Sequence, residues 1–158
     1  MPFAGIRFPK NSVFQHLEMD PLSISASVAG LVAVAANICS TLATISSQKR
    51  EAPRLIESVR LAVIDVRAAV RSLENLLSDL VHAQTRRLDL IQLEQLVVVL
   101  TEAVLTFSEL ETIITPFATS QIWDRLEWVQ KESTVSRIFE RLQRHTSAFS
   151  LILKIVNW

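Results

Sequence analysis

An uncharged stretch of 28 residues from Pro21 to Gln48 is the feature that most constrains how this chain can fold. Asp20 can cap the first free N–H groups of a helix, and Pro21 suits the first helical position because it has no N–H to lose. Charge returns at Lys49, and Pro53 follows shortly after. We therefore expect one long helix between these points. Its bulky apolar face has the spacing of a helix and consists of Leu31, Val34/Ala35, Ile38, Leu42 and Ile45.

The same stretch has a second, smooth face of small residues, along which another backbone could approach closely. At 28 residues it exceeds the length of about 20 that crosses a bilayer, but fifteen of the 28 are Ser, Thr, Ala or Gly. A permanent span is therefore disfavoured, and a buried helix of a soluble bundle is favoured. A helix that is packed at rest and inserts on triggering stays open as a third reading. The residues assigned to a membrane or oligomer role are Leu22, Ser25, Ala29, Gly30, Ala33 and Ala36.

The rest of the chain continues the helical pattern. Only two glycines occur in 158 residues, too few for the tight turns of a sheet protein. We predict an all-α fold, an antiparallel bundle of four long helices plus one short helix, spanning 19–158 after a poorly ordered extension at 1–18. Beyond the first helix, the expected long helices cover Pro53–Ala83, Leu88–Thr115 (ending at Pro116) and Thr134–Val156, and the short one Gln121–Lys131.

Charge and apolar spacing predict how the later helices face each other. The third helix carries acidic residues such as Glu102 and Glu109, whereas the last carries Arg137, Arg141 and Arg144 at i, i+4, i+7. We expect these two helices to be neighbours. Ion pairing with the third helix or solvation is favoured for the three arginines, and contact with an anionic surface stays open. The expected core positions of the two helices are Leu93, Leu96/Val97, Leu100, Val104, Phe107, Leu110, Ile114, Val135, Ile138, Leu142, Phe149, Ile152 and Ile155.

Residues that carry chemistry are sparse. Sixteen basic and sixteen acidic residues balance, so nothing draws the whole chain to nucleic acid. Cys39 is the only cysteine, which excludes an internal disulfide and fits a cytoplasmic setting as a small buried hydrophobe. There is no glycine-rich phosphate loop, nucleophile elbow or His-Glu-x-x-His pair. We predict surface or capping roles for His16, His82 and His145, no catalytic, cofactor-binding or metal-binding residues, and no small-molecule substrate.

The segment Met19-Asp20-Pro21-Leu22-Ser23-Ile24-Ser25-Ala26-Ser27-Val28-Ala29-Gly30-Leu31 resembles the opening of the fungal N-terminal domain of STAND (NLR-like) proteins. This family is also called HeLo-like and is named, too, after the azaphilone-pigment cluster protein L. Ala52-Pro53 is similar to a second landmark of the family, and so is Trp128-Val129-Gln130-Lys131 leading into Arg141-Leu142-Gln143-Arg144. The resemblance covers about Met19 to Val156, and its opening motif is the most specific part.

The resemblance implies a helical bundle related to the membrane-targeting cell-death effectors of heterokaryon incompatibility, in which an N-terminal helix attacks membranes after oligomerisation. Family members usually open at the equivalent of Met19, so residues 1–18 are expected to be an extension or to follow from a mis-chosen start. They commonly continue into a sensor module that this chain lacks, which suggests a stand-alone adaptor or a truncated relative. We expect self-association or a protein partner, with an anionic membrane as a further option and recruitment to it from the cytoplasm. The alternative is an accessory or regulatory protein of an azaphilone-type secondary-metabolite gene cluster.

Overall fold

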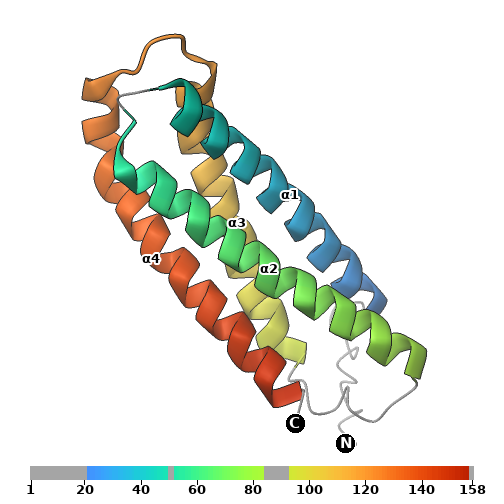
Figure 1. Ribbon diagram of the computed structural model, residues 1–158. Helices are drawn as coiled ribbons and strands as arrows, with labels where there is room; N and C mark the ends of the chain where they lie inside the picture. The colour runs from blue at the N-terminus through green and yellow to red at the C-terminus, as the bar shows by residue number, and fades with distance from the viewer. Residues whose placement is uncertain (1–20, 50–51, 84–92, 157–158) are drawn as a thin grey trace, which may run out of the picture.

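The computed structural model describes residues 21–49, 52–83 and 93–156, so the extension expected at 1–18 lies outside the described residues. Four long helices make up the described part of the chain: α1 (Pro21–Gln48), α2 (Arg54–Ala83), α3 (Leu93–Thr119) and α4 (Arg125–Val156). They run up and down in turn to form an elongated bundle (Figure 1). The all-α bundle of four long helices predicted from the sequence is therefore confirmed.

Each helix packs against two others around the core. α1 contacts α2 and α3, and α4 contacts α2 and α3, so α2 and α3 lie diagonally opposite although they are consecutive in the chain. Because the directions alternate, α1 is parallel to its neighbour α3, and α4 is parallel to α2 (Figure 1). The α1–α2 contact is the most extensive of the four and the α3–α4 contact the least. The interface between α3 and α4 is therefore the smallest of the four, and we call it the α3–α4 seam.

The core is a continuous set of aliphatic and aromatic side chains from all four helices. Phe107 of α3 and Phe149 of α4 are the largest fully buried residues. Two expected core positions were wrong: Val104 is 49% exposed and Ile155 is 53% exposed. In α3 the small side chain of Ala103 occupies the inward position, and the next residue, about 100° further around the helix, points outward. Leu93 lies in α3, but its side chain falls outside the described part of the structure.

The third helix does not stop at Pro116 as predicted but continues to Thr119. Proline removes one N–H from the helical ladder, which would have bonded the carbonyl of Thr112. Pro116 and Thr112 are both exposed, so water can bond that carbonyl. The next residue, Phe117, is buried and packs against Trp123 in a tilted arrangement and against Trp128 edge to face, at ring-centroid distances of 4.9 and 5.8 Å. This aromatic contact holds the last turn of the helix against the end of the bundle.

The short helix expected at 121–131 is not a separate element, because its second half is the beginning of α4. Asp124 caps α4: its Oδ1 accepts hydrogen bonds from the backbone N–H groups of Leu126 and Glu127 at 2.9 and 3.0 Å. Neither glycine nor proline occurs between Arg125 and Val156. Nothing in the local sequence therefore interrupts the helix between Lys131 and Thr134, where a break was predicted.

Candidate functional site

The inward side of α1 is a full partner in the core. Eight of its residues are buried, which confirms the predicted bulky face except at Val34, whose side chain is 39% exposed. The buried residues are Ile24, Val28, Leu31, Val32, Ala35, Ile38, Leu42 and Ile45. The buried apolar side chains of α1 are thus covered by α2 and α3. If α1 left the bundle, the apolar side chains of α2 and α3 that it covers would be exposed as well.

The outward side of α1 is uncharged along its whole length, about 40 Å at 1.5 Å per residue. Ala29, Gly30 and Ala33 are exposed, whereas Ser25 and Ala36 are half-buried at its edges. Leu22 belongs to the helix, but its side chain lies outside the described residues. We call the exposed residues the α1 outward face: Ala26, Ser27, Ala29, Gly30, Ala33, Val34, Asn37, Ser40, Ala43, Ser46, Ser47 and Gln48.

Gly30 lies in the middle of this face, and the packing of the bundle does not require it. A Cβ atom added there would meet nothing within 4 Å. Glycine inside a helix costs about 0.5–1 kcal/mol relative to alanine. The bundle alone therefore gives no reason for a glycine at this position. A surface that approaches the α1 backbone closely would give one.

Among the described residues, α1 alone is long and apolar enough to cross a membrane by length and composition, over Ile24–Gln48. Core helices of soluble proteins satisfy the same test, and in this structure one side of α1 is buried in the bundle. The apolar composition of α1 is therefore compatible both with a core helix and with a membrane-spanning helix. The helix packs on one side, and its other side carries no charge to desolvate.

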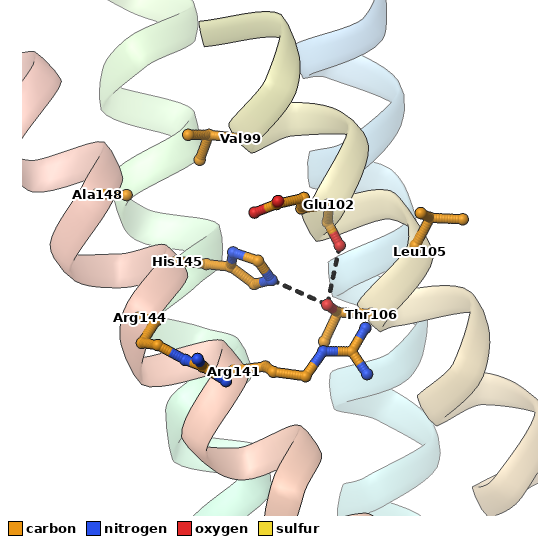
Figure 2. Close-up of a pocket in the computed structure, with 8 residues that line it drawn as sticks. All are labelled: Val99, Glu102, Leu105, Thr106, Arg141, Arg144, His145 and Ala148. Carbon is orange, nitrogen blue, oxygen red and sulfur yellow. Dashed lines mark hydrogen bonds between the residues drawn. The ribbon is translucent and has the colours of Figure 1, made fainter. Parts of the chain in front are cut away.

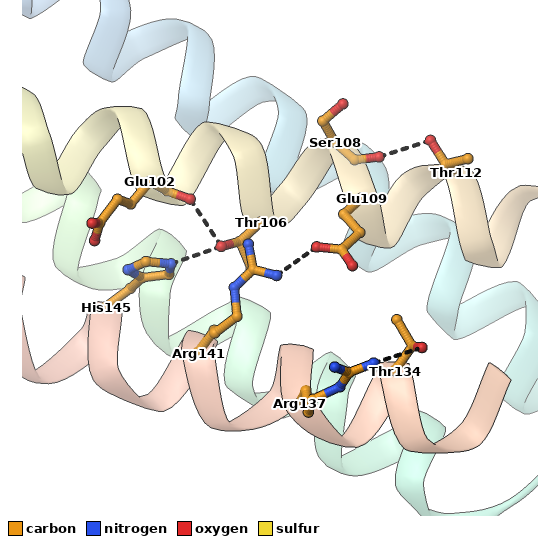
Figure 3. A network of polar contacts seen from close by, with 9 residues as sticks. All are labelled: Glu102, Thr106, Ser108, Glu109, Thr112, Thr134, Arg137, Arg141 and His145. Atoms are coloured by element: carbon orange, nitrogen blue, oxygen red, sulfur yellow. Dashed lines mark hydrogen bonds and ion pairs between the residues drawn. The ribbon is translucent and has the colours of Figure 1, made fainter.

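The predicted proximity of the acidic third helix and the basic last helix is confirmed. Arg141 of α4 reaches across to α3, where its Nη1 donates to Oε2 of Glu109 at 2.5 Å (Figure 3). Within the described ranges, Arg137 donates only to the hydroxyl of Thr134 on its own helix, at 3.3 Å. Arg144 makes no hydrogen bond or ion pair with any residue that the structure describes. The stripe is thus divided: one arginine is engaged with α3, and two keep their guanidinium groups available.

The prediction of a surface or capping role was wrong for His145, which is buried between α3 and α4. Its Nε2 lies 2.8 Å from Oγ1 of Thr106, and that hydroxyl also donates to the backbone carbonyl of Glu102 at 2.8 Å (Figure 2). A hydroxyl has one hydrogen, so the imidazole must donate in the first contact. Neutral His145 therefore carries its proton on Nε2. A signal existed in the sequence, because His145 continues the inward stripe between Leu142 and Phe149.

Burial lowers the pKa of His145 below its ordinary value of 6.5. The carboxylate of Glu102 acts in the opposite direction and raises the pKa, whereas Arg141 and Arg144 lower it further. The imidazole is therefore held in its neutral form beside two cations and one anion. Around it, α3 and α4 leave an open groove of about 400 Å³, in which Arg144, His145 and Leu105 are among the lining residues (Figure 2).

Cys39 is half-buried on α1, slightly more accessible than the buried position expected for it. Burial raises the pKa of its thiol, against the lowering effects of Arg67 and Arg60. The net direction favours the thiol over the reactive thiolate. His82, predicted to lie at the surface, is exposed on α2, while His16 lies outside the described residues.

No group of three or more His, Cys, Asp or Glu side chains within the described ranges is placed to hold a metal ion. Comparison of the chain with protein-family models, with curated proteins and with solved structures finds no match. The functional argument therefore depends on the surfaces of the bundle itself: the α1 outward face, the divided arginine stripe and the groove beside His145.

Proposed function

We propose that this chain is a non-enzymatic interaction module of the HeLo-like type that acts by self-association, or by binding a protein partner, through the α1 outward face. The single observation that carries the proposal is that this exposed face runs the length of a 28-residue helix without one charge. Solvated helix faces usually carry mixed charges, as α2 does with Asp65, Arg71 and Asp79. The α1 face lacks them.

The small residues of the face support close helix–helix contact. Alanine, serine and glycine allow two backbones to approach, and they lose little side-chain entropy when they are covered. The open space above Gly30 gives a second copy or a partner helix a place to approach. A contact along most of the helix would also remove its apolar surface from water without burying an unpaired charge.

A membrane role belongs to the same proposal as a second step. Because eight residues of α1 are buried in the bundle, insertion of this helix requires the bundle to open first. Self-association through the outward face can precede that opening, since it leaves the inward face in place. Arg137 and Arg144 would then contact anionic headgroups, whereas Arg141 would first have to release Glu109. Recruitment from the cytoplasm to an anionic membrane is the localisation that this sequence of steps implies.

Light scattering of purified protein, with Ala33→Glu and Ala68→Glu variants, tests the association step. Both alanines are exposed on helices, Ala33 in the α1 outward face and Ala68 on α2, so neither change disturbs the core. We expect the wild type and Ala68→Glu to gain mass with concentration, or on anionic vesicles, and Ala33→Glu to remain monomeric. A wild-type chain that stays monomeric and binds no vesicle at any concentration would overturn the proposal.

A further inference from the structure

The groove between α3 and α4 has the size of a ligand site and lies in the α3–α4 seam, the smallest of the four helix interfaces. Its volume of about 400 Å³ falls in the range of small-molecule sites, roughly 300–1,000 Å³. None of its lining residues belongs to α1, so the groove is separate from the α1 outward face. A ligand bound in the groove therefore leaves the α1 outward face uncovered.

One part of the groove is positively charged. Arg144 lines it and makes no hydrogen bond or ion pair with any described residue, while Arg141, also in the lining, keeps only Glu109 as its partner. Neutral His145 already donates its Nε2 proton to Thr106 and adds no second charge. The one carboxylate in the lining is that of Glu102, which lies on the His145 side (Figure 2). An anion is therefore attracted to the Arg144 side and repelled on the other.

The remaining lining is apolar, and it continues beyond the groove in one direction. Val99 and Leu105 of α3 and Ala148 of α4 contribute hydrocarbon to the walls. On α4, Leu151 and Ile155 follow Ala148 at helical spacing. Both are more than half exposed, as is Val98 on α3.

The contacts between Arg141 and Glu109 and between His145 and Thr106 fix the antiparallel register of the two helices. The segment of α3 from Glu109 back to Val98 therefore lies beside the segment of α4 from Arg141 forward to Ile155. The seam thus changes from cationic to apolar along its length. From Arg144 to Ile155 the distance is about 16 Å at 1.5 Å per residue, the reach of a medium-length hydrocarbon chain.

We propose that this seam binds a single-chain anionic amphiphile, with its carboxylate or phosphate head on Arg144 and its hydrocarbon chain along Ala148, Leu151 and Val98. Guanidinium groups bind both kinds of head through charge-assisted hydrogen bonds. The tail covers apolar side chains that are otherwise exposed to water. A free phosphate would use only one end of this seam, and a wholly apolar ligand would leave Arg144 unused. The occupant is a ligand and undergoes no reaction.

Isothermal titration calorimetry with dodecanoate and dodecyl phosphate, each below its micelle concentration, tests the proposal on the full chain. We expect both to bind, and inorganic phosphate and dodecyltrimethylammonium to bind much more weakly. Arg144→Gln should weaken binding about tenfold or more, since it removes a charge-assisted hydrogen bond. Glu102→Gln should strengthen it by removing the opposing charge. Arg71→Gln is the control, an exposed arginine on α2 outside the groove, and should leave affinity unchanged.

Failure of both anionic amphiphiles to bind would overturn the proposal, as would equal losses in Arg144→Gln and Arg71→Gln. Binding of anionic vesicles without binding of the monomeric amphiphiles would also overturn it, because the site would then be a membrane surface. A comparison of dodecanoate with dodecyl phosphate shows which head the site prefers. Chemical-shift changes at Val99 and Ala148 on ligand addition would place the ligand in the groove.

Discussion

At the scale of single residues, the contact between His145 and Thr106 places a titratable group inside the bundle. Thr106 is fully buried, and its hydroxyl is engaged by the carbonyl of Glu102 and by the imidazole. The two residues join α3 to α4, the pair of neighbouring helices with the smallest interface. Protonation of His145, or substitution of either residue, should therefore weaken the contact between α3 and α4.

Stability should fall as the pH is lowered through and below about 6.5. Burial depresses the pKa of folded His145 below its ordinary value of 6.5. In that window the unfolded chain therefore takes up a proton that the folded chain resists. Above pH 6.5 the contribution of neutral His145 to the free energy of unfolding is fully present. Urea unfolding of His145→Gln at several pH values should show less loss of unfolding free energy between pH 7.5 and about 5.5 than the wild type. His82→Gln, at an exposed histidine, is the control; an unchanged slope in His145→Gln contradicts the assignment.

Thr106→Val should lower the unfolding free energy by about 1–3 kcal/mol, because it leaves the buried Nε2–H of His145 without an acceptor. Thr112→Val is a matched control, since that hydroxyl also bonds a carbonyl one turn back, that of Ser108 at 2.9 Å, but is exposed. We expect the control to remain within about 0.5 kcal/mol of the wild type. Equal effects of the two substitutions in thermal or urea unfolding would show that the His145 contact contributes nothing.

At the scale of elements, helical periodicity predicted four long helices because each buries one continuous stripe against the others. The ends were harder, because they depend on partners distant in the chain. Pro116 is a local stop signal, yet Phe117 packs against Trp123 and Trp128 and keeps α3 helical past it. Conversely, a break was predicted between Lys131 and Thr134, but neither glycine nor proline enforces one, so α4 continues through this segment.

Asp124→Ala should lower the unfolding free energy by about 0.5–2 kcal/mol, since it removes the cap from the backbone N–H groups of Leu126 and Glu127. The control is Glu132→Ala, an exposed carboxylate inside the same helix, which should change stability much less. Faster hydrogen exchange at the first turn of α4 should accompany the loss. An Asp124→Ala variant as stable as Glu132→Ala would mean that the cap does not hold this end.

At the scale of the whole molecule, the two sides of α1 differ: one is buried in the core, and the other is exposed and uncharged. Apolar spacing predicted which side faces the core, and the small residues of the other side were recognised as a candidate contact surface. The groove beside His145 could not be predicted from the sequence, because it forms only where α3 and α4 come together. A single polar residue on an apolar stripe, such as His145, also does not reveal which residue it will contact. Sequence could pair an acidic helix with a basic one, but only the structure showed that Arg141 is paired with Glu109 while Arg144 has no ion-pair partner among the described residues.

Release of α1 from the bundle should be the slow step in any membrane damage. Ile38→Ala and Ile138→Ala both truncate fully buried isoleucines, at a cost of about 2–5 kcal/mol each. Ile38 lies in α1, whereas Ile138 lies in α4, diagonally opposite. Dye release from anionic vesicles should accelerate more for Ile38→Ala than for Ile138→Ala. Equal acceleration would indicate that general loss of stability, and not the release of α1, controls the process.

The most direct test of the central claim is a spin-label measurement of which face meets a second copy. Since Cys39 is the only cysteine, a Cys39→Ala background allows single nitroxide labels at Ala33→Cys in the α1 outward face and at Ala68→Cys on α2. With rising protein concentration or on anionic vesicles, we predict dipolar broadening between labels at position 33 and none at position 68. Broadening at position 68 alone, or none at position 33 under any of these conditions, would contradict association through α1.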